Sequence, residues 1–117
     1  MKLGHIEILV ADPLHSRVFY EELLGFEVVA VQHERFVWLK LRDRELLLRA
    51  GVPPTAGDSY PSAGIALVFY TDDLAAFAEK CRRKGITTQC DGADEDCITL
   101  QDPDGHWLQA VDPRDHQ

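Results

Sequence analysis

The stretch DPDGHWLQAV near the end of the chain is a polar turn followed by an alternating strand, and its chemistry centres on Gln109. In such a strand Leu108 and Ala110 point to one side. Trp107 and Gln109 then point to the other side. A glutamine amide both accepts and donates hydrogen bonds. Gln109 can therefore bind a metal ion, bind an organic ligand, or fill a pocket inside the protein, and these three interpretations stay open.

The same alternation collects polar and aromatic side chains from other predicted strands on one face. The residues expected there are His5, Glu7, Phe36, Trp38, Lys40, Glu45, Leu47, Arg49, Trp107 and Gln109. Aromatic walls with a few fixed polar groups are typical of a small-molecule site. We therefore expect a concave sheet face whose ligand-binding residues are Glu7, Phe36, Trp38, Lys40, Arg49 and Trp107.

Each of these residues also has a purely structural interpretation. His5 can bond to neighbouring backbone, and Glu45 can be a solvated turn residue. Trp38 and Trp107 can pack in an interface. Lys40 and Arg49, like most such residues, can be solvated charges at a rim. The DPDG turn is expected to cap and aim the last strand without chemistry of its own.

The elements that position this face repeat in the two halves of the chain, as in an internal duplication. One helix is predicted between Asp12 with Pro13 and Gly25, and another between Asp72 or Asp73 and Gly85. Their expected buried sides are Leu14, Val18, Phe19 and Leu23 in the first helix, and Leu74, Phe77, Ala78 and Cys81 in the second. Strands are predicted at 5–11, 26–32, 35–42 and 45–50, and again at 65–71, 86–90, 97–101 and 106–111.

The predicted fold class is α+β, with two βαβββ modules at about 1–52 and 62–113 and a linker at 53–61. They are expected to form a curved, mostly antiparallel sheet with the helices on its outer face. A chain of 117 residues with 45% hydrophobic residues supports one core. Half of it would bury too little apolar area to fold alone. We therefore predict one domain, 1–117.

The amino-acid composition limits the classes of partner that we expect for this protein. The net charge of −8 disfavours nucleic acid and anionic membranes. The first apolar run is too short for a signal segment or a membrane span, so a cytoplasmic location is expected. Three cysteines without CxxC spacing fit reduced thiols better than a disulfide framework.

Four motifs carry a resemblance to a known family: His5 followed seven positions later by Asp12, FYEELLGFEV at 19–28, GIALVFYTDDLAAF at 64–77, and DPDGHWLQAV. With them the chain resembles the vicinal oxygen chelate superfamily of glyoxalase I, extradiol dioxygenases and bleomycin-resistance proteins. The resemblance implies paired βαβββ modules that form a cup, commonly in a homodimer. Because the superfamily hosts many chemistries, it does not by itself fix the activity.

The resemblance also implies positions for a divalent metal. Metal-using members place one ligand on the first and one on the last strand of each module, usually His and then Glu. The corresponding residues are His5, Glu45, Gly64 or Ala66, and Gln109. Leu47 shares the face of Glu45, so this register is open by two residues. The implied site is incomplete because glycine and alanine offer no side-chain ligand.

Three functions follow from these residues. The first is sequestration of a hydrophobic or aromatic compound with no cofactor, as in the bleomycin-resistance proteins. The second is a metal-dependent lyase, isomerase or dioxygenase, in which His5, Glu45 and Gln109 hold Ni, Zn, Mn or Fe and Glu45 is the base. The third is a protein-interaction module, for which an aromatic cup has no use. Whether the protein is an enzyme stays open.

Overall fold

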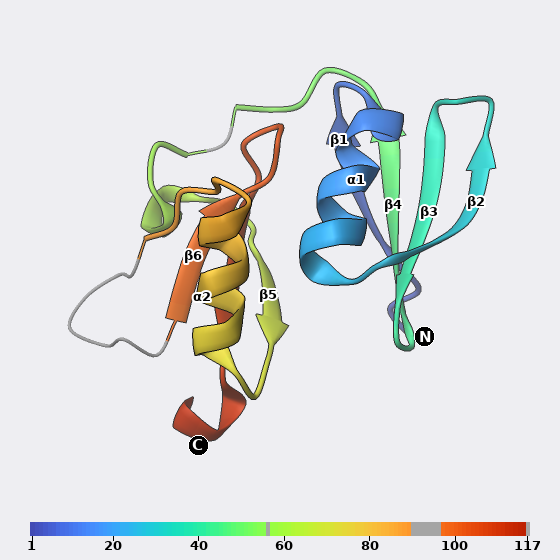
Figure 1. Cartoon of the computed structure of the whole chain (residues 1–117). Helices are drawn as coiled ribbons and strands as arrows, with labels where there is room; N and C mark the ends of the chain where they lie inside the picture. Colours follow the sequence, from blue (N-terminus) through green and yellow to red (C-terminus); the bar gives the residue numbers. More distant parts are fainter. Residues whose placement is uncertain (56, 90–96, 117) are drawn as a thin grey trace. The chain divides into compact units, whose positions relative to one another are not determined.

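A computed structural model describes residues 1–55, 57–89 and 97–116. It divides into two compact units, Met1–Pro54 (the first unit) and Thr55–Gln117 (the second unit). The first unit contains β1 (Ile6–Val10), α1 (Pro13–Leu24), β2 (Glu27–Gln32), β3 (Phe36–Leu41) and β4 (Arg44–Ala50). The second unit contains the 3-10 helix η1 (Tyr60–Ser62), β5 (Leu67–Tyr70), α2 (Leu74–Arg83), β6 (Cys97–Gln101), β7 (Trp107–Val111) and the 3-10 helix η2 (Pro113–His116) (Figure 1).

Each unit combines an α-helix with a mixed sheet, which confirms the predicted α+β class. The strand order is β1-β4-β3-β2 in the first unit and β5-β7-β6 in the second. In both units the strand before the helix pairs in parallel with the last strand, β1 with β4 and β5 with β7. The pairs β2–β3, β3–β4 and β6–β7 are antiparallel. The shared parallel pairing agrees with a duplicated module.

The first helix begins and ends where the sequence predicts. Asp12 is its N-cap and accepts a hydrogen bond from the backbone N–H of His15 at 3.3 Å. Pro13 follows at the first helical position, where its missing N–H has no intrahelical partner to lose. Gly25 ends the helix with φ of +82°, a conformation that glycine adopts without steric cost. The chain therefore reverses directly into β2.

The buried side of α1 differs from the prediction. The buried residues are Pro13, Ser16, Tyr20 and Leu23, whereas Val18 is 40% exposed. They recur at intervals of three and four residues, a stripe that lies against the sheet. Tyr20 is fully buried although its side chain is polar at one end, which apolar periodicity alone does not reveal. The prediction was right for Leu23 and wrong for Val18.

The second helix begins at Asp73, whose carboxylate accepts from the backbone N–H of Ala76 at 3.0 Å. Gly85, at φ of +71°, follows its last turn as predicted. Cys81 is buried, whereas Ala78 is exposed, so only part of the predicted apolar stripe is covered. Among the described residues, neither α-helix has the length and apolar character needed to cross a bilayer.

The predicted strand at 86–90 is wrong for residues 86–88. The backbone N–H of Ile86 donates to the backbone oxygen of Cys81 at 2.9 Å and so completes the end of α2. Thr87 and Thr88 are exposed and have no strand conformation. Of the described residues 86–89, only Gln89 forms a bridge, with two 2.8 Å hydrogen bonds to Thr99. Residue 90 lies outside the described residues.

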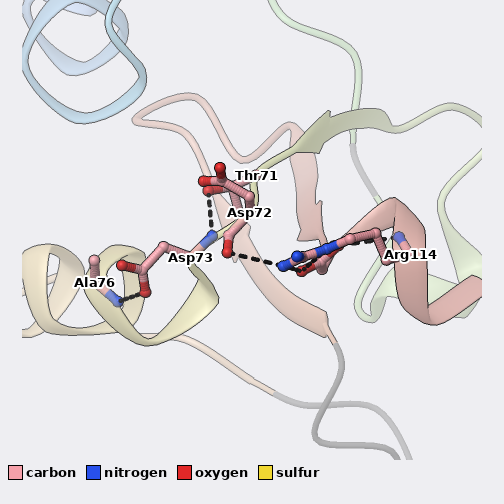
Figure 2. A network of polar contacts seen from close by, with 6 residues as sticks. Thr71, Asp72, Asp73, Ala76 and Arg114 are labelled. Atoms are coloured by element: carbon pink, nitrogen blue, oxygen red, sulfur yellow. Dashed lines mark hydrogen bonds and ion pairs between the residues drawn. The ribbon is translucent and has the colours of Figure 1, made fainter.

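A polar network ties the end of the second unit to the start of α2, as Figure 2 shows. Arg114 donates through Nη2 to the backbone oxygen of Asp72 at 3.2 Å. The same guanidinium donates through Nε to Asp112 Oδ1 at 2.9 Å. Thr71 Oγ1 accepts from the N–H of Asp73 at 3.2 Å beside it. The network fixes the turn between β5 and α2.

Candidate functional site

The polar face of the first unit follows the predicted alternation. Glu7 on β1 pairs with Leu47 on β4, and Leu47 pairs with Trp38 on β3, so these three residues form one row across the sheet. Paired residues of neighbouring strands point to the same face. The opposite face carries Val37 and Leu39, which are fully buried. The sheet therefore separates an apolar core from a mixed polar and aromatic face.

Four residues of this face are in contact, and we name them the Glu7 cluster: His5, Glu7, Trp38 and Arg49. Arg49 Nη1 donates to Glu7 Oε1 at 2.7 Å. His5 Nε2 lies 3.9 Å from the other carboxylate oxygen of Glu7. The rings of His5 and Trp38 meet edge to face with centroids 4.7 Å apart. The structure thus brings three predicted ligand-binding residues, Glu7, Trp38 and Arg49, together with His5, a predicted metal ligand.

The indole N–H of Trp38 is also held in place. It donates to Gln32 Oε1 on β2 at 3.3 Å. Gln32 was not among the predicted residues, and strict alternation along 26–32 could not place it, because the register shifts between Val28 and Ala30. An indole ring whose N–H is bonded and which meets the His5 ring edge to face keeps a defined orientation. Its aromatic surface can therefore serve as a platform for a planar ligand.

The remaining candidates of the first unit lie beside this cluster. Lys40 and Glu45 are directly opposite each other on β3 and β4, and both are exposed. Glu45 comes one residue before Leu46, whose partner on β1 is Ile6. His5 precedes β1, and the register extended by one residue would bring it level with Glu45. Phe36 pairs with Arg49 and is half-buried.

Gln109 lies in the middle of the polar face of the second unit. Its partners in the register are Val68 on β5 and Thr99 on β6. Its Nε2 donates to Thr99 Oγ1 at 3.4 Å, and its Oε1 accepts from the hydroxyl of Tyr60 at 3.4 Å. Both distances are at the long end for hydrogen bonds, so these contacts are weak. The amide is oriented by the protein's own side chains.

Trp107 differs from its expected exposure. It lies on the predicted face but is only 5% exposed. Its indole N–H donates to the backbone oxygen of Gly57 at 2.7 Å. The ring of Tyr60 meets it edge to face at a centroid distance of 6.3 Å. Alternation predicts the face of a side chain but not the loop above it, and Tyr60 was missed for that reason.

The second unit does not offer the family's usual metal ligands at the expected positions. Gly64 and Ala66 precede β5 and carry no ligand atom in their side chains. The residue directly opposite Gln109 is Val68, which is aliphatic. The oxygen of the Gln109 amide already accepts from Tyr60. This donor set does not fit a divalent ion, which prefers imidazole, carboxylate or thiolate ligands.

A different group of potential ligands, Asp102, Asp104 and His106, has ligand atoms within 4.8 Å of one another. The side chain of Asp102 is fully buried. It accepts from the backbone N–H groups of Asp104 and His106, each at 2.9 Å. Its other oxygen lies 2.8 Å from His106 Nδ1. Both oxygens therefore hold the turn before β7, in agreement with the structural role predicted for DPDG.

Comparisons with known proteins agree with this architecture. A possible glyoxalase from Bacillus cereus matches with a TM-score of 0.79 and 16% identity, over 95% of this chain and 98% of that chain. A lactoylglutathione lyase from Agrobacterium tumefaciens matches with a TM-score of 0.71 and 18% identity, over 95% and 92% of the two chains. A fosfomycin resistance protein from Listeria monocytogenes, in complex with Mn(II) and a dihydroxypropylphosphonic acid, matches with a TM-score of 0.75 and 15% identity, over 94% and 88%.

At these identities the solved structures bear on the fold alone. No curated protein matches the chain. A family model, however, matches residues 2–110, which span both modules. That match includes His5 and β1 after it, both capped helices and the DPDGHWLQ segment. The chain therefore belongs to the Glyoxalase/Bleomycin resistance protein/Dioxygenase superfamily.

Proposed function

We propose that this protein binds and sequesters a hydrophobic or aromatic small molecule and lacks a complete metal site. The observation that carries the proposal is the environment of Gln109: its amide lies between Tyr60 and Thr99, opposite the aliphatic Val68. A ligand set needs several charged or imidazole donors around one point. Aromatic and amide groups instead suit a neutral or weakly polar organic compound.

The Glu7 cluster supplies the second half of this proposal. Trp38 offers an aromatic surface, and Arg49 keeps guanidinium N–H groups beyond the one bonded to Glu7. Phe36 and Lys40 flank it on β3. We propose Glu7, Phe36, Trp38, Lys40, Arg49 and Trp107 as the ligand-binding residues. By analogy with the superfamily we also propose that the chain works as one domain, 1–117, and as a homodimer.

A metal-dependent lyase, isomerase or dioxygenase is the second candidate. The observation in its favour is the β1–β4 register, which, extended by one residue beyond Ile6 and Leu46, would bring His5 level with Glu45. In that case His5, Glu45 and Gln109 would be the ligands, with Ni, Zn, Mn or Fe as the ion. Glu45 would be the base, since an amide such as Gln109 cannot take up a proton at neutral pH. Bound metal would act as a Lewis acid on the substrate's oxygen atoms.

Metal content separates the two candidates. The protein, purified without a histidine tag, is analysed for bound elements and titrated with Ni²⁺, Zn²⁺, Mn²⁺ and Fe²⁺. If the protein sequesters its ligand without a metal, the wild type should bind no more metal than the variants His5→Ala, Glu45→Gln and Gln109→Ala. Near-stoichiometric binding that all three substitutions abolish would establish the metal-dependent candidate instead. Tryptophan fluorescence of the metal-free protein then screens aromatic compounds, with Trp38→Phe and Trp107→Phe assigning the response.

A further inference from the structure

The segment Gly57–Ser62, which we name the strap, is a turn that braces itself. The backbone N–H of Ser59 donates to Ser62 Oγ at 3.1 Å, and that hydroxyl donates to the backbone oxygen of Ser59 at 2.8 Å. Gly57 approaches Ser62 so closely that a Cβ at position 57 would lie 2.4 Å from its Oγ and 2.6 Å from its backbone oxygen. Only glycine fits there, so the strap keeps its shape as one piece.

The strap contacts the polar face of the second unit at two places, which we call its Gly57 end and its Tyr60 end, and the two contacts are unequal. At Gly57 its backbone oxygen accepts from Trp107 Nε1 at 2.7 Å, a short and well-formed hydrogen bond. At Tyr60 the hydroxyl reaches Gln109 Oε1 at 3.4 Å. The Tyr60 end is therefore easier to detach than the Gly57 end.

The two side chains that the strap contacts, Trp107 and Gln109, are the ones through which this unit would bind a ligand under the proposed function. Trp107 is almost fully buried, so an aromatic ligand has no open indole surface to contact. The acceptor oxygen of Gln109 is engaged by Tyr60. In effect Tyr60 presents an aromatic ring and a hydroxyl to the two groups that an organic ligand would use.

We propose that the strap is a lid on the second unit, in which Tyr60 stands in the place of the ligand and must leave when a ligand binds. This inference rests on the proposed small-molecule function. The Gly57 end acts as the hinge, and the Tyr60 end opens. The favoured ligand is an aromatic compound with a hydrogen-bond donor, because it can replace both the ring and the hydroxyl of Tyr60. A protein that binds only in its open form has an apparent affinity equal to its intrinsic affinity multiplied by the fraction of molecules that are open.

The lid itself is tested without any ligand. In a Trp38→Phe background the only tryptophan is Trp107, whose collisional quenching by acrylamide measures its accessibility. We expect Tyr60→Ala to increase the quenching constant at least about twofold, because the ring that meets Trp107 edge to face is removed. Tyr70→Ala, which removes a tyrosine that is 74% exposed, should leave the constant unchanged. Equal quenching in Tyr60→Ala and its parent would overturn the lid.

Occupancy is tested with a probe, the aromatic dye 8-anilinonaphthalene-1-sulfonate. We expect Tyr60→Ala to bind it about two- to tenfold more tightly than the parent protein, because the competing side chain is gone. Weaker binding would mean that Tyr60 is a ligand contact and would overturn the proposed competition. Should no aromatic compound bind any variant, the proposed function fails, while equal quenching in Tyr60→Ala and its parent would separately overturn the lid.

Discussion

Arg49 on β4 and Glu7 on β1 form a 2.7 Å ion pair that spans two parallel strands on the polar face of the first unit. The side chains are 52% and 37% exposed, respectively, so water screens the pair. Such pairs contribute little to folding free energy. The main consequence of the pair is orientation: it holds the guanidinium beside the carboxylate that His5 also approaches.

A double-mutant cycle of Glu7→Gln and Arg49→Gln measures this pair. We expect a coupling free energy of about 0.2–1 kcal/mol from urea unfolding, decreasing in high salt because the charges are exposed. The i,i+4 pair of Arg17 and Glu21, at 3.0 Å, provides a matched cycle within one helix. A coupling well above that range and independent of salt would show that the pair is effectively buried.

Asp102→Ala is expected to destabilise the protein far more than removal of an exposed aspartate. The buried carboxylate accepts two backbone hydrogen bonds at 2.9 Å, and its loss leaves both N–H groups without their acceptor. Hydrogen bonds to a charged group contribute about 1.5–3 kcal/mol, so a loss of about 2–4 kcal/mol is expected in urea unfolding. Asp43→Ala, whose side chain is 88% exposed, is the control. Equal effects of the two substitutions would contradict a structural role for Asp102.

The fold could be predicted from the sequence because its local signals agree. Asp12 with Pro13 and Gly25 determine the ends of α1, and the alternation of the strands separates the two faces of each sheet. The failures have local causes. Residues 86–88 were predicted as part of a strand after the second helix, but the backbone N–H of Ile86 donates to the backbone oxygen of Cys81 at the end of α2. Val18 was predicted to be buried from its apolar character. That character alone does not determine how a helix is rotated against its sheet.

The candidate site was only partly predictable. Alternation correctly placed Glu7, Trp38 and Arg49 on one face, yet their mutual contacts depend on register, which the sequence does not contain. Tyr60 was missed because it lies in a loop, where no periodicity predicts its direction. Its contacts with Trp107 and Gln109 are made across 47 and 49 positions. Contacts at that separation follow from the fold and not from a local pattern.

Alkaline pH should weaken the protein through Cys81. Burial raises the pKa of this thiol above its ordinary value of 9.0, an effect that the charge of Lys80 partly offsets. The stabilisation is fully present below the unfolded pKa and is lost as the pH rises through the folded pKa, because the unfolded thiol ionises first. We therefore expect the free energy of unfolding to fall more steeply above pH 9 in wild type than in Cys81→Ala. Parallel curves for the two proteins would contradict this origin of the pH dependence.

The β5–β7 register indicates where a metal ligand could be added beside Gln109. Val68 and Gln109 are direct neighbours on parallel strands and point to the same face. Side chains of such neighbours are close enough to bind one ion together. In the double variant Val68→His with Gln109→Glu, an imidazole replaces the aliphatic side chain of Val68. A full negative charge replaces the amide dipole of Gln109. We expect this double variant to bind Ni²⁺ or Zn²⁺ at least about tenfold more tightly than wild type in calorimetric titration.

The matched control moves the histidine two residues along the same strand. Tyr70 pairs with Val111, so Tyr70→His with Gln109→Glu separates the two new ligands along the strands. That variant should bind the ion less tightly than the Val68 variant, because one ion cannot reach both side chains in good geometry. Equal binding by the two double variants would show that the carboxylate alone determines the affinity. In that case the lack of a histidine opposite Gln109 would not be the reason why the ligand set of this module is incomplete.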